Sequence, residues 1–339
     1  LQATFFYLPG NHDYTNQKLA DVWRKKLGKD YYAFQVNQSL FLMMNMYEQG
    51  VTGLSQEQVD YFKTALKAHD RNNPVYVFSH APLWKVWDQE GYRELKSLLY
   101  QRRATFFCGH EHHYLYWEDQ GHPHYMMAKT GGGFARQQPE LGEFDHVLWV
   151  TASRNESNVA NILLDGIISS RIVDNSSESI VNILRSESWF RVEPEIADSN
   201  KERSIHSHLV ISNDSDQPMQ AEGTLPVNNL FAFSPAAISE ILPPKSQRQI
   251  PVWALRKDKT PVDQWEPVFV ELAASFPESR PERKAEARKR WIIDNQKFCT
   301  PAGGKSDTIF VEKPEQVDES WCWHGVSDGS FEFTTTHDN

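Results

Sequence analysis

Two hydrophobic patterns divide the chain. Up to about residue 150, short continuous apolar runs alternate with segments whose apolar residues recur every three or four positions. The continuous runs predict strands, at residues 4–8, 31–36, 40–46, 75–78, 105–108, 124–129 and 146–151. The periodic segments predict helices, at residues 16–27, 54–66 and 91–100. Strands that alternate with helices predict an α/β domain with helices packed outside the sheet.

The ends of two helices are marked by capping residues. Gly28 follows the first periodic segment and is a plausible stop signal, since glycine readily ends a helix. Ser55 precedes the second segment, and Gln58 stands three positions later, which is the spacing of a capping box.

Beyond about residue 173 the pattern changes to short β-like segments separated by turns rich in proline and serine. This texture predicts a β-sandwich. The charged run at residues 278–291 reads as a solvated helix or linker that leads into a third, incomplete segment. The expected domains are therefore residues 1–172, 180–277 and 283–339, the last a partial β-rich domain.

Composition narrows the range of partners. The formal net charge of −10 argues against nucleic acid, because a phosphate backbone needs a basic surface. No stretch approaches 18 consecutive apolar residues, so no transmembrane segment is expected. The three cysteines are too few for a disulfide framework. Cys108 reads as a core residue, and whether Cys299 pairs with Cys322 stays open.

Three predicted strands end in polar clusters that contain histidine. The clusters are Asn11-His12-Asp13, Ser79-His80 and His110-Glu111-His112. Ligands of an α/β sheet collect beyond the carboxyl ends of its strands, so neighbouring strands would bring these clusters into one pocket. Imidazole is a good ligand for zinc or iron, and an amide oxygen suits harder ions. The clusters therefore suit a site of two metal ions, which acts as a clamp for displacement at phosphorus.

The three clusters also carry a resemblance. Together with their flanking residues, they resemble the motifs of the calcineurin-like metallophosphoesterase superfamily, as Gly10-Asn11-His12-Asp13, Ser79-His80-Ala81-Pro82 and Gly109-His110-Glu111-His112. The context GHEHHYLYW is similar to the purple acid phosphatase branch. The resemblance covers roughly the first 150 residues, and Gly131-Gly132-Gly133 matches the glycine-rich turn that follows the last motif strand.

The resemblance implies a role for each metal-site residue. Asn11, His80 and His110 look like ligands of one metal, and His112 looks like a ligand of the other. The family implies iron, zinc or manganese as the two divalent or trivalent ions. It also implies a metallophosphoesterase β-sandwich flanked by helices, an αββα arrangement, followed here by immunoglobulin-like β-sandwich modules.

The resemblance implies catalytic roles for two further residues. His12 is similar to the histidine that contacts the transferring phosphoryl group and assists the leaving group, and Asp13 would orient it.

His113 faces either substrate or solvent. Trp84 either lines the substrate pocket or packs in the interior. His122 and His124 flank Pro123 in a predicted hairpin, which favours a surface position.

The sequence departs from the family in one respect. The family's Asp-x-His and Gly-Asp motifs, which supply most ligands of one metal and the bridging carboxylate, do not precede Gly10-Asn11-His12 here. The expectation is an N-terminally truncated fragment that supplies ligands mainly for one metal and is weak or inactive by itself.

The expected function is hydrolysis of a small phosphate ester by a metal-activated hydroxide. The alternative is a non-catalytic scaffold whose fold and β modules bind a glycan or a protein partner. Metal-site residues at five positions with this order and spacing favour catalysis. A phosphoesterase joined to β-sandwiches favours the periplasm or the cell exterior.

Overall fold

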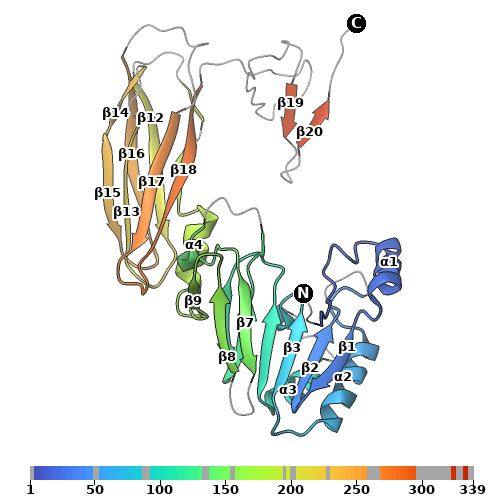
Figure 1. The fold of residues 1–339 in the computed structure, drawn as a ribbon. Helices are drawn as coiled ribbons and strands as arrows, with labels where there is room; N and C mark the ends of the chain where they lie inside the picture. The colour runs from blue at the N-terminus through green and yellow to red at the C-terminus, as the bar shows by residue number, and fades with distance from the viewer. Residues whose placement is uncertain are drawn as a thin grey trace, which may run out of the picture.

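The chain folds into an α/β part and a β-rich part, joined by helix α4 (Glu178–Ser186) (Figure 1). The computed structural model describes residues 4–48, 53–85, 92–131, 137–152, 157–193, 196–198, 204–226, 230–257, 268–294, 322–325 and 331–334. Within these residues the fold is mixed, with many strands and few helices.

The α/β part is built on a six-stranded sheet within the described residues, in the order β1-β2-β3-β4-β6-β5. Its strands are β1 (Tyr32–Val36), β2 (Ser39–Met44), β3 (Val75–Ser79), β4 (Ala104–Cys108), β6 (His122–Met126) and β5 (Leu115–Asp119). The pairs β2–β3, β3–β4 and β4–β6 are parallel. The loops that follow β2, β3 and β4 therefore leave the sheet at the same edge, which brings the segments after Met44, Ser79 and Cys108 together.

Three helices pack on one face of this sheet. They are α1 (Gln17–Leu27), α2 (Gln56–Ala68) and α3 (Tyr92–Tyr100). Gly28 ends α1 and the Ser55 side chain accepts the amide of Gln58, as expected, and Asn16 caps the start of α1. The Gln58 side chain, which a full capping box would turn back to Ser55, bonds Asn45 and Glu48. Alternate strand residues, such as Leu42 and Val77, meet the helices in one continuous core.

The opposite face of the sheet carries a second, three-stranded sheet in the described residues. It consists of β7 (Val147–Ala152), β8 (Ser157–Ile162) and β9 (Ile167–Ser169). Tyr76 and Phe107, which point away from the helices, form a core with Phe144. The described layers are therefore helices, sheet and sheet.

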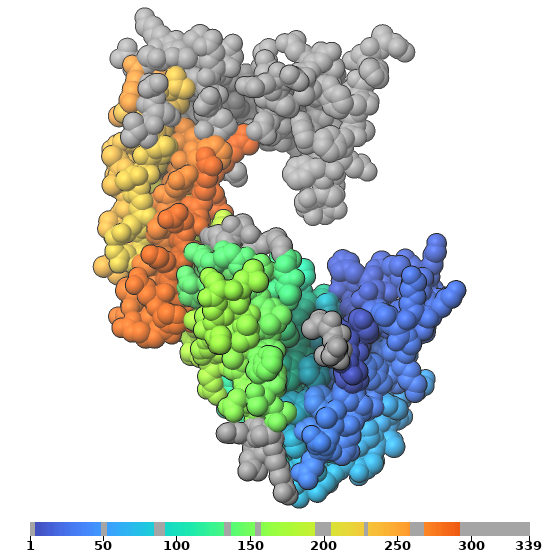
Figure 2. All heavy atoms as spheres, viewed as in Figure 1, coloured from blue at the N-terminus to red at the C-terminus, as the bar shows by residue number. Residues whose placement is uncertain are grey.

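A row of stacked aromatic rings runs across this second face. Phe34 stacks on Phe6 at 4.0 Å and on Phe41 at 4.9 Å between ring centroids. The row continues where Phe107 stacks on Phe78 at 4.9 Å. Its beginning is exposed, because Phe6 keeps 46% of its accessible surface. The N-terminal segment lies at the molecular surface, in dark blue in Figure 2.

The strand predicted at residues 4–8 does not form. Phe5 is 65% exposed, and the described contacts of this segment run through side chains, as when the Tyr32 hydroxyl donates to the Tyr7 carbonyl. A β-strand needs a partner for its main-chain groups, and no described strand pairs with this segment.

The β-rich part contains two packed sheets in the described residues. One has the order β10 (Phe190–Glu193), β12 (Ser204–Asn213), β16 (Ser246–Arg256), β14 (Phe231–Ser234). The other has the order β11 (Ile196–Asp198), β18 (Arg283–Asp294), β17 (Val268–Phe276), β13 (Met219–Thr224), β15 (Ala237–Leu242). The sheets are consistent with a β-sandwich module.

The charged run at residues 278–291 was expected to be a solvated helix or linker, but the structure shows a strand. Most of it forms β18, which pairs with β17 from Val268↔Trp291 to Phe276↔Arg283. Alternate residues of β18, among them Ala285 and Ala287, are buried, which explains how a charged segment becomes a strand. The expected boundary between residues 277 and 283 therefore falls inside a hairpin of this sheet. Beyond it, only the hairpin of β19 (Cys322–Gly325) and β20 (Phe331–Thr334) is described.

The two parts share one core. Residues of both parts, from Cys108 and Leu141 to Leu272 and Trp291, form a single apolar cluster. Arg283 is 2% exposed and crosses between the parts, donating to the carbonyls of Glu140 at 3.1 Å and Ile172 at 2.8 Å.

Two histidines expected at the surface lie elsewhere. His124 is fully buried, and its ring stacks on Phe106 at 4.2 Å. His122 is half-buried and stacks on Tyr100 at 4.4 Å. The predicted hairpin does form, but its second strand, β6, pairs with β4 inside the sheet.

Cys108 is buried as expected, whereas Cys299 lies outside the described residues. No helix in the described part of the chain is both long and apolar enough to cross a membrane.

Candidate metal centre

A tight turn presents the first cluster. The amide of Gly10 donates to Asp13 Oδ2 at 2.8 Å, and the amide of Asp13 donates back to the Gly10 carbonyl at 3.1 Å. The buried ring of Tyr14 then anchors the chain as it leaves the turn. These contacts fix the backbone of Asn11 and His12 between two anchored residues.

Asn11 meets His80 directly. Asn11 Oδ1 lies 3.0 Å from His80 Nε2, and both side chains are half-buried. Gly10 makes this approach possible, since a Cβ at that position would lie 3.0 Å from the His80 ring. The glycine of the motif therefore serves close packing against His80.

The third cluster lies beside the second. The Gly109 amide donates to the His80 carbonyl at 2.8 Å, which ties the loop after β4 to the loop after β3. The rings of His80 and His110 then lie 5.2 Å apart between centroids, edge to face. His110 and His112 both adopt left-handed backbone conformations, with φ of 74° and 59°. Such conformations are uncommon outside glycine and are often found at functional sites.

The electrostatic surroundings keep His80 neutral. Burial lowers the pKa of His80, the nearby imidazoles of His110, His112 and His12 lower it further, and the Asp13 carboxylate opposes the shift. A neutral imidazole offers a lone pair, which a metal ligand requires.

One distance in the donor set is compatible with a metal ion. Two adjacent ligands of an octahedral ion, each about 2.1 Å from the metal, lie about 3 Å apart. Asn11 Oδ1 and His80 Nε2 are 3.0 Å apart, which is also the distance of a hydrogen bond between them. With His110 the set has one amide oxygen and two imidazoles. Histidine, cysteine, aspartate and glutamate alone form no group of three in the described residues that could hold a metal.

The remaining predicted site residues have individual surroundings. His12, Asp13 and His112 are exposed, and the described hydrogen bond of the Asp13 side chain is to Gly10, so its effect on His12 stays a prediction. His113 Nδ1 lies 2.9 Å from the Glu111 carbonyl oxygen. Trp84 packs edge to face on Trp117 and His124, as an interior side chain would. The Gly131 amide donates to Asp145, while Gly132 and Gly133 lie outside the described residues.

Sequence reasoning missed Tyr47. This residue follows β2, the third parallel strand that ends at this edge, and its hydroxyl oxygen lies 3.4 Å from His110 Nδ1. The same strand-end rule that selected His80 and His110 applies here. Tyr47 escaped notice because the segment after β2 contains no histidine or carboxylate until Glu48.

The comparison with family models bears on this site. Residues 1–114 match the calcineurin-like phosphoesterase family. The match includes Asn11, His80, His110 and His112, and it supports the superfamily that the motifs predicted. Calcineurin-like phosphoesterases are generally metal-dependent hydrolases of phosphoesters, which agrees with the donor set at the strand ends.

Other comparisons add little to the calcineurin-like match. The comparison with curated proteins gives no match. The chain is similar to WR4, an MSP family member of C. elegans, at 11% identity over 31% of this chain and 98% of that chain, with a TM-score of 0.24. It is also similar to a FixG-related protein from Vibrio parahaemolyticus, at 15% identity over 31% of this chain and 94% of that chain, with a TM-score of 0.21. The likeness to the E. coli chaperone DraB has 12% identity over 31% of this chain and 54% of that chain, with a TM-score of 0.21. These likenesses are too slight to support an argument.

Proposed function

We propose that the chain carries part of the active site of a metal-dependent phosphoesterase. The observation that carries the proposal is the meeting of Asn11, His80 and His110 at one sheet edge, inside the residues that match the calcineurin-like phosphoesterase family. Polar side chains of these types, from separate segments of the chain, have no packing reason to converge.

Each residue has a role in this proposal. Asn11 Oδ1 and His80 Nε2, together with an imidazole nitrogen of His110, hold one ion, which is iron, zinc or manganese. The bound metals supply a hydroxide nucleophile near neutral pH and neutralise phosphate charge. His12 is exposed at the turn, where its imidazole can reach a bound ester and donate a proton to the departing oxygen. Asp13 orients His12, and His113 contacts the substrate.

A second metal needs more ligands than the described residues bring to the site. His112 is the residue proposed for it, and a single imidazole does not hold a metal that ordinarily has three or four protein ligands. We propose that carboxylates complete this second position, in a domain of αββα arrangement from the purple acid phosphatase-like branch.

The β-rich part has its own place in the proposal. We propose that it is an immunoglobulin-like module, that a glycan is its candidate ligand, and that the complete enzyme works in the periplasm or outside the cell. The support is the joining of a phosphoesterase-like part to a β-sandwich in an acidic chain with a formal charge of −10.

Elemental analysis tests the metal centre. The purified chain is dialysed against trace zinc, iron and manganese, and the bound metal is counted per chain. We expect close to one ion for the wild type and a loss of most of it in His80→Ala, since His80 is the central ligand. His206→Ala, at an exposed position on β12, is the matched control and should retain the metal.

Three outcomes are informative for this proposal. No metal in the wild type, or equal metal in wild type and His80→Ala, would overturn the site. Two ions per chain would show that the chain completes both positions, and the assignment of its ligands mainly to one metal would be wrong.

A further inference from the structure

We propose that Tyr47 is a positioning residue for His110, fixing its ring and tautomer so that Nε2 is the nitrogen offered to the metal. The inference rests on the proposed function, because it concerns the same metal site. It adds a residue to which neither the motifs nor the family match assigns a role.

The contacts of the Tyr47 ring support this role. Tyr47 is 8% exposed, and its hydroxyl oxygen lies 3.4 Å from His110 Nδ1. The ring centroid of Tyr47 lies 5.9 Å from that of His110 and 6.0 Å from that of His80. One side chain therefore touches both imidazoles that the proposal assigns to a single ion, and it fills the space behind them.

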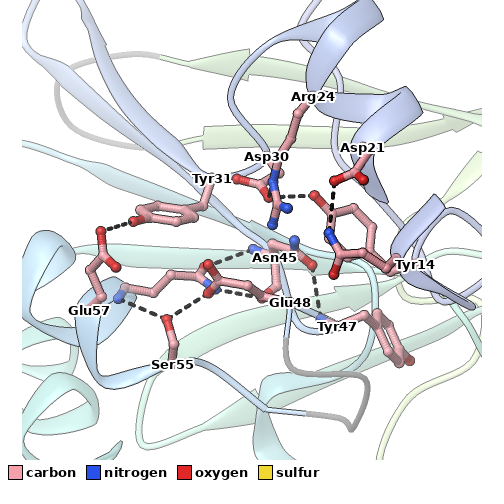
Figure 3. Close-up of polar contacts among 12 residues, drawn as sticks. Tyr14, Asp21, Arg24, Asp30, Tyr31, Asn45, Tyr47, Glu48, Ser55 and Glu57 are labelled. Atoms are coloured by element: carbon pink, nitrogen blue, oxygen red, sulfur yellow. Dashed lines mark hydrogen bonds and ion pairs between the residues drawn. The ribbon is translucent and has the colours of Figure 1, made fainter. Parts of the chain in front are cut away.

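The main chain that carries Tyr47 is held firmly. Asn45 Oδ1 accepts the Tyr47 amide at 2.9 Å, as Figure 3 shows, while the Tyr47 ring points away from this network. The side chain of Gln58, on helix α2, holds the main chain of Asn45. Gln58 Oε1 accepts the main-chain amide of Asn45 at 3.1 Å, and Gln58 Nε2 donates to the main-chain carbonyl of Asn45 at 2.9 Å. Asn45 and Gln58 are both fully buried.

Two further residues fix Gln58 in place. Glu48 Oε2 accepts from the Ser55 hydroxyl at 2.6 Å (Figure 3). It also accepts from Gln58 Nε2 at 2.7 Å. Ser55 is also the N-cap of α2. The network thus joins the start of a core helix to the segment behind the metal site, and it leaves Tyr47 little freedom to move.

The chemistry of a ligating histidine explains why such a partner is useful. One ring nitrogen binds the metal, and the other usually donates its N–H to an acceptor that sets the tautomer and the ring orientation. In this proposal the acceptor is the Tyr47 hydroxyl oxygen, which lies 3.4 Å from Nδ1 of His110. A proton on Nδ1 leaves the lone pair on Nε2. His110 itself sits in a left-handed backbone conformation, with φ of 74°.

The first test reads the tautomer of His110 in the metal-free chain. Long-range ¹H–¹⁵N NMR spectra of the imidazoles, recorded above pH 7, distinguish a proton on Nδ1 from one on Nε2. We expect the Nδ1–H form in the wild type and a shift toward Nε2–H in Tyr47→Phe. Tyr92→Phe is the matched control, because it removes a buried hydroxyl that bonds the main chain of Leu54 and does not contact a histidine of the site.

The second test measures metal affinity with Co²⁺, whose visible absorption reports the ligand geometry. We expect Tyr47→Phe to bind Co²⁺ about tenfold more weakly, the lower end of the usual cost of losing such a partner, with an altered band shape. Tyr92→Phe should bind as the wild type does. Circular dichroism checks that both variants are folded.

The outcomes separate this inference from the proposed function. A wild type that binds Co²⁺ at His80 and His110, with Tyr47→Phe unchanged in affinity, spectrum and tautomer, would overturn the role of Tyr47 and leave the metal site standing. A wild type that binds no metal would overturn both. An equal loss in Tyr47→Phe and Tyr92→Phe would show that Tyr47 contributes only to stability, which also overturns the inference.

Discussion

The imidazole of His124 lies in the interior between aromatic rings. It stacks on Phe106 within 6° of parallel, and Trp84 meets it edge to face. Its Nε2 lies 3.3 Å from the Tyr100 hydroxyl, and its Nδ1 has no hydrogen-bond partner among the described residues. Burial lowers the pKa of His124 to about 3, and the Asp119 carboxylate only partly opposes the shift.

Stability should therefore fall in mild acid because of His124. The folded pKa of about 3 lies below the unfolded value of about 6.5, so between these values the unfolded state binds more protons and stability rises with pH. From pH 7.5 to 5.5, His124 should cost the wild type about 1.4 kcal/mol. Urea unfolding at both pH values measures this. His124→Phe keeps the stacking, and its unfolding free energy should fall by about 1.4 kcal/mol less than that of the wild type between these pH values. An equal pH dependence in both proteins would show that His124 is not the cause.

At the scale of single residues, the strand-end rule recovered the polar side chains that converge and missed those that support them. Asn11, His80 and His110 were found because histidine after an apolar run is conspicuous. Tyr47 was missed because a tyrosine after a strand looks like ordinary core. His124 was placed at the surface because its neighbour Pro123 marks a turn, and the sequence does not show that the following strand enters the sheet beside β4.

At the scale of elements, local signals succeeded where the local chain decides. Helix α1 ends at the expected residue and α2 begins after the expected cap, Ser55, because caps and turns act over three or four residues. The segment at residues 4–8 and the charged strand β18 were misjudged because strands depend on distant partners. One has no described partner, and the other gains a nine-residue ladder with β17.

The cap of α2 gives a prediction for one element. Ser55→Ala removes the oxygen that accepts the Gln58 amide at 3.2 Å and also the hydroxyl that donates to Glu48. We expect a loss of about 1 kcal/mol in the free energy of unfolding, the usual cost of an N-cap, measured by urea denaturation. Ser55→Thr keeps a hydroxyl and should lose much less. Similar losses in both variants would show that the cap hydroxyl is not what stabilises the helix.

At the scale of the whole molecule, the α/β and β-rich parts are packed as one body. Their side chains share an apolar cluster, and Arg283 donates across the junction to Glu140 and Ile172. The sequence indicated two kinds of texture and placed the change near residue 173. It gave no sign of the shared core, because contacts between parts leave no periodic signal along the chain.

Arg283→Met tests this junction. The change leaves two main-chain carbonyls without their donor, and each buried unsatisfied group costs about 1–3 kcal/mol, so we expect a total loss of about 2–6 kcal/mol in unfolding free energy. Arg280→Met is the control, since Arg280 is exposed and bonds only within its own turn among the described contacts. Calorimetry gives both values. A loss no larger than that of the control would mean that the junction does not depend on Arg283.

The open beginning of the aromatic row has a consequence for solution assays. Phe5, Phe6 and Tyr7 line a surface hollow together with Leu27, Lys29 and Tyr32. Environment-sensitive dyes bind exposed apolar rings, so the folded chain should already bind such a dye and give a high fluorescence baseline. Melting curves of the variants are therefore better followed by intrinsic tryptophan emission, which does not depend on a dye entering this hollow.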